Sequence, residues 1–341
     1  MKHIITLLLN ILLITCVGTP QTANNENEHH SHDEDISVFF PNSSGNLPVT
    51  SFREVWGYVI DGQEAALKKG LPITDIGYFG AEVDIYGSLS KLPDRKKLSG
   101  FNGKVHLVVV CGGSALTYFT LMPGSPQRRA LIADLIKATE NYDGLNIDFE
   151  NIPARSGEAF LSFLRELRAG LPNKMLTIAL YGRVRTVAND VYDYEKIKPY
   201  VDRVFIMAYD EHWGGGPAGP VSSIQWCRRV AEHSLRTIGA EKLVMGIPLY
   251  GRAWSTPNHH RALIYSSTER LKNSYNITDE RRVNGTPAFN YDSNVSVKVF
   301  YEDEYSISAR LVMYKSMNIN AIGFWRIGQE TPRVWDILKV D

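Results

Sequence analysis

The chain has 341 residues, of which 44% are hydrophobic and 22% are charged, and its formal net charge is zero. This length is ample for one large hydrophobic core, and the balanced charge gives no support to a nucleic-acid-binding surface or a strongly acidic partner. The cysteines Cys16, Cys111 and Cys227 form neither a disulfide framework nor a metal-ligand cluster, so we expect no metal and no cofactor.

The first residues have the pattern of an export signal. Lys2 precedes the apolar run IITLLLNILLIT, which is too short to span a membrane comfortably. Cys16 ends this run, as in a bacterial lipoprotein signal, although Thr15 departs from the Gly, Ala or Ser usual there. We predict a lipoprotein-like signal peptide over residues 1–16, cleaved before Cys16, which would become lipidated. The protein would then be exported and held at the bacterial cell envelope by the lipid anchor alone. The alternative is an ordinary cleaved signal and a secreted protein.

The stretch TPQTANNENEHHSHDEDIS that follows is polar and low in bulky apolar residues, so we predict a disordered tether over residues 17–50. His29, His30 and His32 in this stretch could bind a metal ion, but we favour a solvated linker.

Residues 51–341 alternate short β-rich runs with segments of helical spacing. The predicted strands begin at Val55, Asp75, Lys104, Leu145, Met175, Arg203, Lys242 and Ala321. Eight strands alternating with helices predict the α/β class and a (β/α)8 TIM barrel. The competing fold is a doubly wound open sheet, but no glycine-rich phosphate loop follows the first strand. Between the seventh and eighth strands, at about residues 254–303, we predict a small β-rich insertion on the catalytic face. We expect a monomer.

The stretch YDGLNIDFEN, from Tyr142 to Asn151, alternates polar and apolar residues with the period of a strand. Asn146, Asp148 and Glu150 therefore share one side, and Leu145, Ile147 and Phe149 share the other. The simplest interpretation is a strand whose polar face is exposed to solvent. In a barrel, however, the polar side faces the packed interior, with Glu150 at the C-terminal mouth. Burying carboxylates there costs on the order of several kcal/mol without partners, which favours a catalytic role.

DGLNIDFE resembles the DGxDxDxE signature of glycoside hydrolase family 18, the chitinases and related N-acetylglucosaminidases. Four further segments resemble motifs of the same family in the same order: VVVCGG, IMAYDEHWG, MGIPLYGRAW and GFWRIG. The similarity covers essentially residues 51–341. The NIDFE sequence and the MAYDEHWGGGPAGPVSS stretch resemble the branch of this family that acts on bacterial cell-wall glycan.

The resemblance implies a retaining glycosidase that cleaves β-1,4 bonds of glycans containing N-acetylglucosamine, by substrate-assisted catalysis. It implies that Glu150 is the general acid and then the base for water, and that Asp148 binds the substrate acetamide N–H and raises the pKa of Glu150. It also implies that Tyr209 orients the acetamide carbonyl and that Trp325 lies under the sugar. A buried core role is the alternative for both aromatic residues. Tyr58, Met207 and Asp210 are further candidate binding residues, whereas Arg252 is expected to brace loops.

Asn146 stands where the family usually carries Asp, and we expect its amide to donate to Asp148, with activity retained at an altered pH profile. Two other functions compete with hydrolysis. One is a lectin-like surface lipoprotein that binds chitin or N-acetylglucosamine on the same barrel without cleaving it. The other is an interaction module. The presence of Glu150 argues against a lectin, because non-catalytic members of the family typically lack this glutamate.

Overall fold

The computed structural model describes residues 36–41, 46–255, 259–293 and 295–341. A nine-stranded sheet closes on itself, because its first strand pairs in parallel both with the next strand and with the last one. The predicted TIM barrel is thereby confirmed. Its parallel strands are β2 (Glu54–Ile60), β3 (Asp75–Val83), β5 (Lys104–Cys111), β6 (Gly144–Phe149), β7 (Met175–Tyr181), β8 (Arg203–Met207), β9 (Leu243–Pro248) and β15 (Ala321–Trp325). The ninth strand, β4 (Leu89–Ser90), pairs antiparallel with the end of β3.

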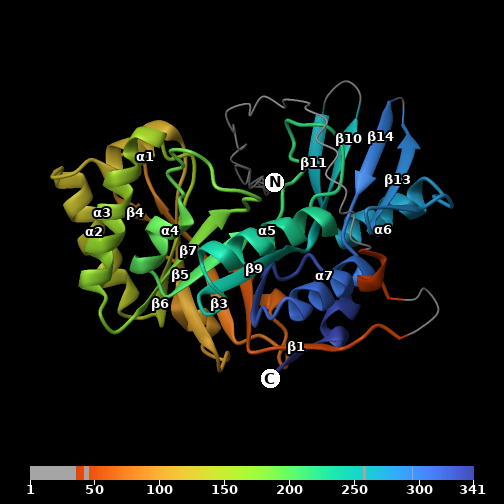
Figure 1. Cartoon of the computed structure of the whole chain (residues 1–341), viewed down its shortest axis with the longest axis horizontal. Helices are drawn as coiled ribbons and strands as arrows, with labels where there is room; N and C mark the ends of the chain where they lie inside the picture. The colour runs from red at the N-terminus through yellow and green to blue at the C-terminus, as the bar shows by residue number, and fades with distance from the viewer. Residues whose placement is uncertain (1–35, 42–45, 256–258, 294) are drawn as a thin grey trace, which may run out of the picture.

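Helices cover the outside of the barrel (Figure 1). The serine before each of the second and fifth helices caps it by accepting a backbone N–H, and Asp303 caps the seventh in the same way. The α-helices are α1 (Ser114–Leu121), α2 (Pro126–Thr139), α3 (Gly157–Gly170), α4 (Tyr194–Ile197), α5 (Ile224–Thr237), α6 (Tyr265–Ser274) and α7 (Glu304–Ser316). Shorter 3-10 turns are η1 (Ile36–Phe39), η2 (Glu64–Ala66), η3 (Arg95–Leu98), η4 (Ala154–Ser156), η5 (Lys198–Tyr200) and η6 (Pro332–Ile337).

The strand β6 separates two kinds of core. Leu145, Ile147 and Phe149 belong to the large hydrophobic cluster between barrel and helices. The other side of the strand faces the barrel interior, where Asn146 lies between side chains of β2 and β7. This agrees with the side assignment drawn from the alternation of the sequence.

A second sheet stands between β9 and β15. Its strands are antiparallel in the order β11-β10-β14-β13-β12. They comprise β10 (Tyr250–Ser255), β11 (His259–Ile264), β12 (Arg281–Val283), β13 (Thr286–Asp292) and β14 (Ser296–Phe300). The sheet begins at Tyr250, earlier than the residue 254 expected from sequence. The reason is that only Leu249 separates β9 from β10, so the two strands read as one apolar run.

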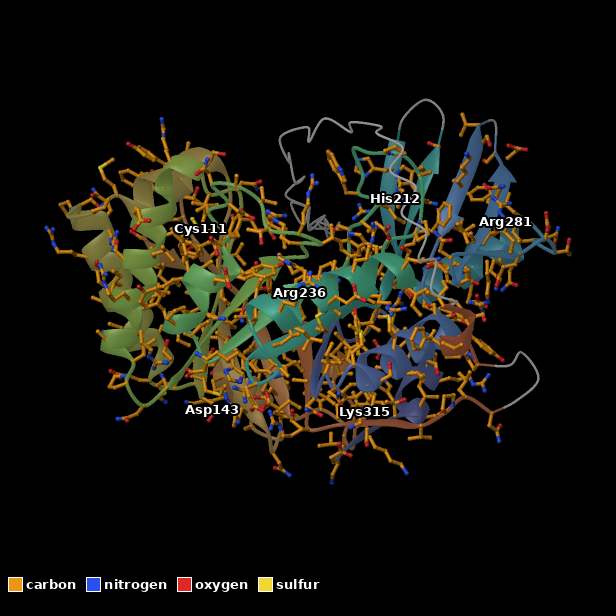
Figure 2. The ribbon with its side chains drawn as sticks, in the orientation of Figure 1. Cys111, Asp143, His212, Arg236, Arg281 and Lys315 are labelled. Atoms are coloured by element: carbon orange, nitrogen blue, oxygen red, sulfur yellow. The ribbon has the colours of Figure 1, made fainter. Side chains whose placement is uncertain are left out.

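The polarity of the barrel fixes where a site can lie. Figure 2 shows Asp143, which precedes β6, and Lys315, in the last turn of α7, at the lower edge of the view. Cys111 at the end of β5 and His212 beyond β8 lie at the opposite, upper side. The second sheet rises on that upper side, at the right of Figure 1. It therefore extends the C-terminal face, where barrel enzymes hold their active sites.

Part of the segment predicted as a tether packs on the domain. Ile36, Phe39, Phe40 and Leu47 lie against the hydrophobic core. The strand β1 (Thr50–Phe52) pairs in parallel with β16 (Leu338–Val340). The tether prediction is thus wrong for these residues, because it weighed the overall polarity of the segment above its few bulky apolar side chains. The predicted signal, Cys16 and the histidine-rich stretch lie outside the described residues.

Within the described part of the chain, no helix is both long and apolar enough to cross a membrane. Cys111 and Cys227 are buried and form no disulfide.

Candidate active site

A cleft of about 610 Å³ opens at the C-terminal ends of the barrel strands. Barrel residues and residues of the second sheet line it together, and aromatic side chains dominate its walls. Such a concave, mostly apolar surface with a few converging polar groups is typical of a ligand site. The lining includes Tyr58, Phe79, Asp148, Glu150, Tyr181, Arg183, Met207, Tyr209, Asp210, Trp213, Trp226, Tyr250, Arg252, Leu263, Trp325, Arg326 and Gln329.

Asn146 lies below this cleft and does not line it. It has no exposed surface. Its Nδ2 donates to Thr177 Oγ1 across 2.7 Å, and its Oδ1 accepts from the Tyr58 hydroxyl at 3.2 Å. The expected bond from Asn146 to Asp148 is absent among the described contacts, and the amide instead bonds to side chains of β7 and β2. Asn146 thus does not reach the described cleft itself, but it holds the hydroxyl of Tyr58, which does line the cleft.

Asp148 lines the cleft yet is only 6% exposed. Its Oδ1 is buried and has no hydrogen-bond partner among the described residues. Burial raises the pKa of Asp148 well above its ordinary value, and the nearby Glu150 carboxylate raises this pKa further. A buried carboxylate oxygen without a partner costs free energy. This side chain is therefore suited either to hold a proton itself or to accept a hydrogen bond from a ligand.

Glu150 follows the last residue of β6 and reaches the mouth. Its backbone N–H donates to the Cys111 carbonyl at 2.9 Å, which continues the β5–β6 ladder by one residue. The Tyr181 hydroxyl donates to Glu150 Oε2 across 3.0 Å. A carboxyl group that faces the cleft and is held by a hydroxyl is well placed to exchange a proton with a ligand. The effect of Asp148 on the pKa of Glu150 stays a prediction.

Tyr181 was missed from the sequence, although a signal was present. It is the last residue of β7, and Thr177 and Ala179 precede it at two-residue spacing. Thr177 bonds Asn146 inside the barrel, and Ala179 and Tyr181 line the cleft. The inward side of β7 thus runs beside the inward side of β6. The same alternation that identified Asn146, Asp148 and Glu150 applies to this neighbouring strand.

The three aromatic residues and the methionine predicted from sequence meet in the cleft. Tyr58, Met207, Tyr209 and Trp325 all line it. The Trp325 ring lies 5.3 Å from the ring of Tyr58 and 5.1 Å from that of Phe79, measured between centroids. These contacts hold the indole in the wall of the cleft, where its flat apolar face is available to a ring-shaped ligand. Phe79 was not foreseen.

Both predicted tyrosines have pKa values well above the ordinary one, so they remain hydroxyl donors at physiological pH. Burial is the main cause of the raised pKa of Tyr58, and the negative charge of Asp148 adds to it. Burial likewise dominates the raised pKa of Tyr209, with contributions from neighbouring tyrosines and from Asp148.

Asp210 joins the barrel to the second sheet. Its Oδ1 accepts from the Tyr250 hydroxyl at 2.7 Å and from Arg252 Nη2 at 2.5 Å. Arg252 therefore braces the wall, as expected, and also lines the cleft. Because Asp210 is committed to these partners, it is a structural element of the wall as well as part of the lining.

The loop after β8 and the helix α5 that follows it each supply a tryptophan that sequence reasoning missed. Trp213 and Trp226 line the cleft. A side chain at Gly214 would collide with the His260 ring of β11, since a Cβ atom there would come within 2.1 Å of that ring. The glycines of HWGGGPAGP thus allow the loop to approach the second sheet closely, and this approach is consistent with Trp213 lying over the cleft.

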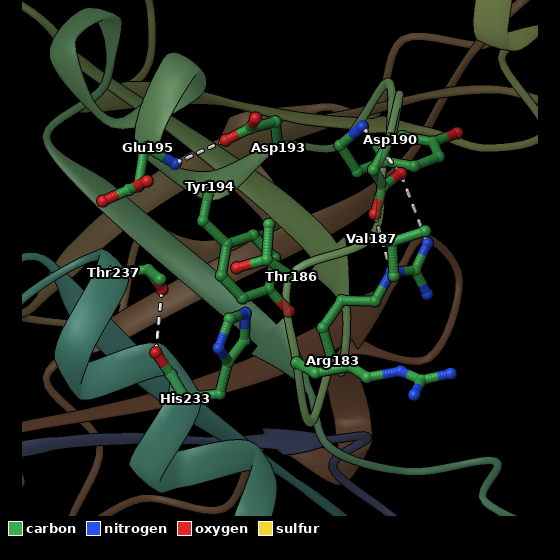
Figure 3. A pocket seen from close by; sticks show the side chains of 11 residues that line it. Arg183, Thr186, Val187, Asp190, Asp193, Tyr194, Glu195, His233 and Thr237 are labelled. Atoms are coloured by element: carbon green, nitrogen blue, oxygen red, sulfur yellow. Dashed lines mark hydrogen bonds and ion pairs between the residues drawn. The ribbon is translucent and has the colours of Figure 1, made fainter.

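The other side of the cleft is formed by the segment after β7. Arg183 lines the cleft and pairs with Asp190, with 2.8 Å between Nε and Oδ2 (Figure 3). Beside this pair lies a small hollow of about 20 Å³, lined by Tyr194, His233 and Thr237 among others. That volume accommodates about one water molecule, so we treat the hollow as a packing defect and not as a binding site.

Among the described residues, no group of His, Cys, Asp and Glu is arranged to hold a metal ion. The polar groups that line the cleft include the carboxyls of Asp148 and Glu150 and the hydroxyls of Tyr181 and Tyr209. This set is suited to proton transfer and to binding a neutral polar group such as an amide.

Comparisons with known proteins agree with this geometry. The family described as "Glycosyl hydrolases family 18" matches residues 65–330. The cortical fragment-lytic enzyme of Bacillus anthracis is 25% identical over 291 residues, which are 78% of this chain and 67% of that protein. The class V chitinase CHIT5 of Lotus japonicus is 25% identical over 275 residues, covering 67% of each chain.

The fold has counterparts among solved structures. The spore cortex-lytic enzyme SleL of Bacillus cereus superimposes with a TM-score of 0.75 at 24% identity, covering 86% of this chain and 76% of that one. The chain spans between 52% and 67% of the length of the first curated relatives that it matches.

Proposed function

The chain belongs to glycosyl hydrolase family 18, and on this premise we propose that it is a retaining glycosidase acting on β-1,4-linked glycans that contain N-acetylglucosamine. One observation carries the mechanism. Three carboxyl groups line the described cleft, those of Asp148, Glu150 and Asp210. Asp210 is bound to Arg252 and Tyr250, and Asp148 shares a strand with Glu150. No described carboxylate of the lining is thus free to attack from across the sugar.

The nucleophile must then come from the substrate, as in the substrate-assisted exceptions to the two-carboxylate rule. In the first step Glu150 gives its proton to the glycosidic oxygen, while the 2-acetamido oxygen of the bound sugar attacks C1. The bond to the leaving sugar breaks, and a bicyclic oxazolinium ion forms. In the second step Glu150 removes a proton from water, which attacks C1 and reopens the ring. Two inversions at C1 give net retention.

Asp148 and Tyr209 are proposed to hold the acetamide group. The buried Oδ1 of Asp148 lacks a partner, and an acetamide N–H would supply one. The Tyr209 hydroxyl, kept protonated by its burial, would donate to the acetamide oxygen and orient it toward C1. A negative charge on Asp148 would also stabilise the positive oxazolinium ion.

We propose bacterial cell-wall glycan as the natural substrate. The support is the similarity to a cortical fragment-lytic enzyme together with the NIDFE and MAYDEHWG segments. Chitin-like oligosaccharide is the other candidate, which the similarity to a class V chitinase supports. We further propose that the protein acts as a monomer at the cell envelope, anchored through lipid on Cys16. Mass analysis of the mature N-terminus would reject the anchor if the chain began beyond Cys16.

The test is to incubate the purified protein with peptidoglycan strands and with chitin oligomers, and to determine the mass of the released ends. We expect cleavage after an N-acetylglucosamine unit, retention at C1, and competitive inhibition by a thiazoline analogue of the cyclised sugar. Cleavage of an unacetylated glucan without any effect of the thiazoline would overturn the mechanism. Tight binding of these glycans without turnover would favour the lectin instead.

A further inference from the structure

Three arginines line the described part of the cleft, and one of them differs from the other two. Arg183 pairs with Asp190, and Arg252 pairs with Asp210. Arg326 makes one hydrogen bond, from Nη1 to the neutral Oε1 of Gln63, and no described carboxylate lies within ion-pair distance of it. The positive charges of Arg183 and Arg252 are thus compensated within the protein, whereas Arg326 has no counter-ion among the described residues.

The surroundings of Arg326 make this lack of a counter-ion costly. Its side chain is partly buried, and burial lowers the pKa of its guanidinium, with no described carboxylate nearby to oppose the shift. A desolvated cation is stabilised strongly when an anion approaches it. The same position in a solvated loop would have little electrostatic effect.

The free part of the guanidinium has the geometry that a carboxylate requires. Gln63 engages Nη1, so the edge formed by Nε and Nη2 has no partner among the described residues. Because neither atom is among the buried polar atoms without a partner, both are accessible to a ligand. Two parallel N–H groups on one edge match the two oxygens of a carboxylate.

The position of Arg326 relates this edge to the substrate. Arg326 directly follows Trp325, the last residue of the last barrel strand, and both residues line the cleft. Gln63, which holds the guanidinium, follows the end of β2 at the same mouth. A group bound by Arg326 therefore belongs to the sugar above Trp325 or to the one next to it.

We propose that Arg326 is a specificity residue that binds a carboxylate carried by the glycan, so that acidic amino-sugar strands are preferred over neutral N-acetylglucosamine homopolymers. The proposal deepens the proposed function and rests on it. In cell-wall glycan the carboxylate has two sources, namely the 3-O-lactyl ether of the muramyl sugar and the peptide stem attached to it. Chitin has neither. Both sources present the same chemistry to the guanidinium, and separate substrates distinguish them.

The first test compares Arg326→Met with the wild type on matched substrates. These are a neutral N-acetylglucosamine hexamer, stem-free cell-wall strands with free lactyl carboxylates, the same strands after methyl esterification, and strands that keep their peptide stems. For the acidic strands we expect kcat/KM to fall about 10-fold to 100-fold, mainly through KM, as loss of a charged hydrogen bond implies. The hexamer and the esterified strands should change less than about twofold. Arg326→Lys should recover part of the loss, since lysine restores the positive charge but not the two parallel N–H groups of the guanidinium.

The outcomes separate the hypotheses. Equal losses on acidic and neutral substrates would mean that Arg326 only positions Trp325, and unchanged kinetics on every substrate would also overturn the proposal. A loss confined to stem-bearing strands would assign the carboxylate to the peptide, whereas a loss on stem-free strands would assign it to the lactyl group.

A second measurement does not depend on turnover. Calorimetric titration of stem-free acidic strands into Glu150→Gln and into the double variant Glu150→Gln with Arg326→Met should show about 10-fold or greater weakening, which diminishes at high salt. Equal affinities would refute the carboxylate contact. A wild-type protein that cleaves nothing would instead refute the proposed hydrolase activity, and this titration would still decide the role of Arg326.

Discussion

Two buried carboxyl groups in this protein have opposite surroundings. Glu302 lies between β14 and α7 and is 3% exposed, and Asp148 at the barrel mouth is 6% exposed. Glu302 Oε2 accepts from Arg310 and from Ser306 Oγ. Among the described residues, no cation lies beside Asp148, and its Oδ1 has no hydrogen-bond partner.

Burial raises the pKa of both groups, but the neighbours then act in opposite directions. The positive charge of Arg310 opposes the rise in the pKa of Glu302. The negative charge of Glu150 adds to the rise in the pKa of Asp148. Arg310 also donates to the carbonyl of Ser222, so the Glu302 group ties α7 to the segment that leads from β8 into α5. Oε2 of Glu302 is thus held by a cation and a hydroxyl within the fold, although its Oε1 has no described partner, whereas no described cation offsets the charge of Asp148.

The largest effect that would test this contrast is on turnover. Glu150→Gln removes the proton donor at the cleft without changing its shape, so we expect kcat to fall on the order of 10³-fold or more. Thermal stability and glycan binding should remain. The exposed Glu158→Gln in the first turn of α3 serves as the matched control and should turn over normally. Near wild-type turnover of Glu150→Gln on an unactivated oligosaccharide would remove Glu150 from the mechanism.

The next effect is on stability and concerns the Glu302 group. Arg310→Met leaves Glu302 buried without its counter-ion, which should lower the free energy of unfolding by about 3 kcal/mol or more. Denaturant titration at neutral pH measures this. The double variant with Glu302→Gln should be more stable than Arg310→Met alone, because the uncompensated charge is gone. A single variant as stable as the wild type would mean that the pair contributes nothing to the fold.

Replacement of Asp148 should change the free energy of unfolding in the opposite direction. The folded-state pKa of Asp148 lies above its unfolded value, so its contribution to stability is fully present below about pH 4 and is lost as pH rises through the folded pKa. Asp148→Asn lacks this titration. As pH rises from about 4 through the folded-state pKa, the wild type should lose stability relative to this variant. The difference in the free energy of unfolding should grow by up to about 1.4 kcal/mol per pH unit, while kcat of the variant is lower than that of the wild type. Parallel pH profiles would contradict the raised pKa.

The smallest effect is expected below the cleft. Asn146→Asp places a third carboxyl inside the barrel, where the amide now bonds Thr177 and Tyr58. Two acids one strand repeat apart would share a proton. We expect kcat/KM to change less than about 10-fold, with at least one apparent ionisation moved upward in its pH profile. Superimposable profiles would mean that residue 146 is not coupled to the catalytic carboxyls.

The barrel and its inward carboxyls could be predicted because they depend on local periodicity. Leu145, Ile147 and Phe149 alternate with Asn146, Asp148 and Glu150, and this pattern determines the two sides of β6 without knowledge of any other strand. The partners of these residues could not be predicted so directly. Which residue of β7 meets Asn146 depends on register, and the pairing of Asn146 with Thr177 is a property of two distant segments. The prediction of a hydrogen bond between Asn146 and Asp148 was wrong for this reason.

The second sheet and the N-terminal segment illustrate the same limit. The apolar run KLVMGIPLY contains parts of both β9 and β10, and nothing within it indicates that the chain changes sheets at Leu249. Phe39 and Phe40 were judged by the polar residues around them, although each packs on the core. Trp213 and Trp226 belong to a loop and a helix whose approach to the cleft depends on tertiary contacts.

The closure of the barrel has a consequence for the order in which the molecule is made. Glu54 pairs with Ala321, so the ring of strands is completed only after β15 has been made. Contacts between such distant segments require a large loop to close, and they slow folding. Trp325 and Arg326 reach the cleft on that last strand. A nascent chain that stops short of residue 321 therefore lacks both the last barrel strand and the part of the cleft wall formed by Trp325 and Arg326, so the cleft is completed only after β15 has been made.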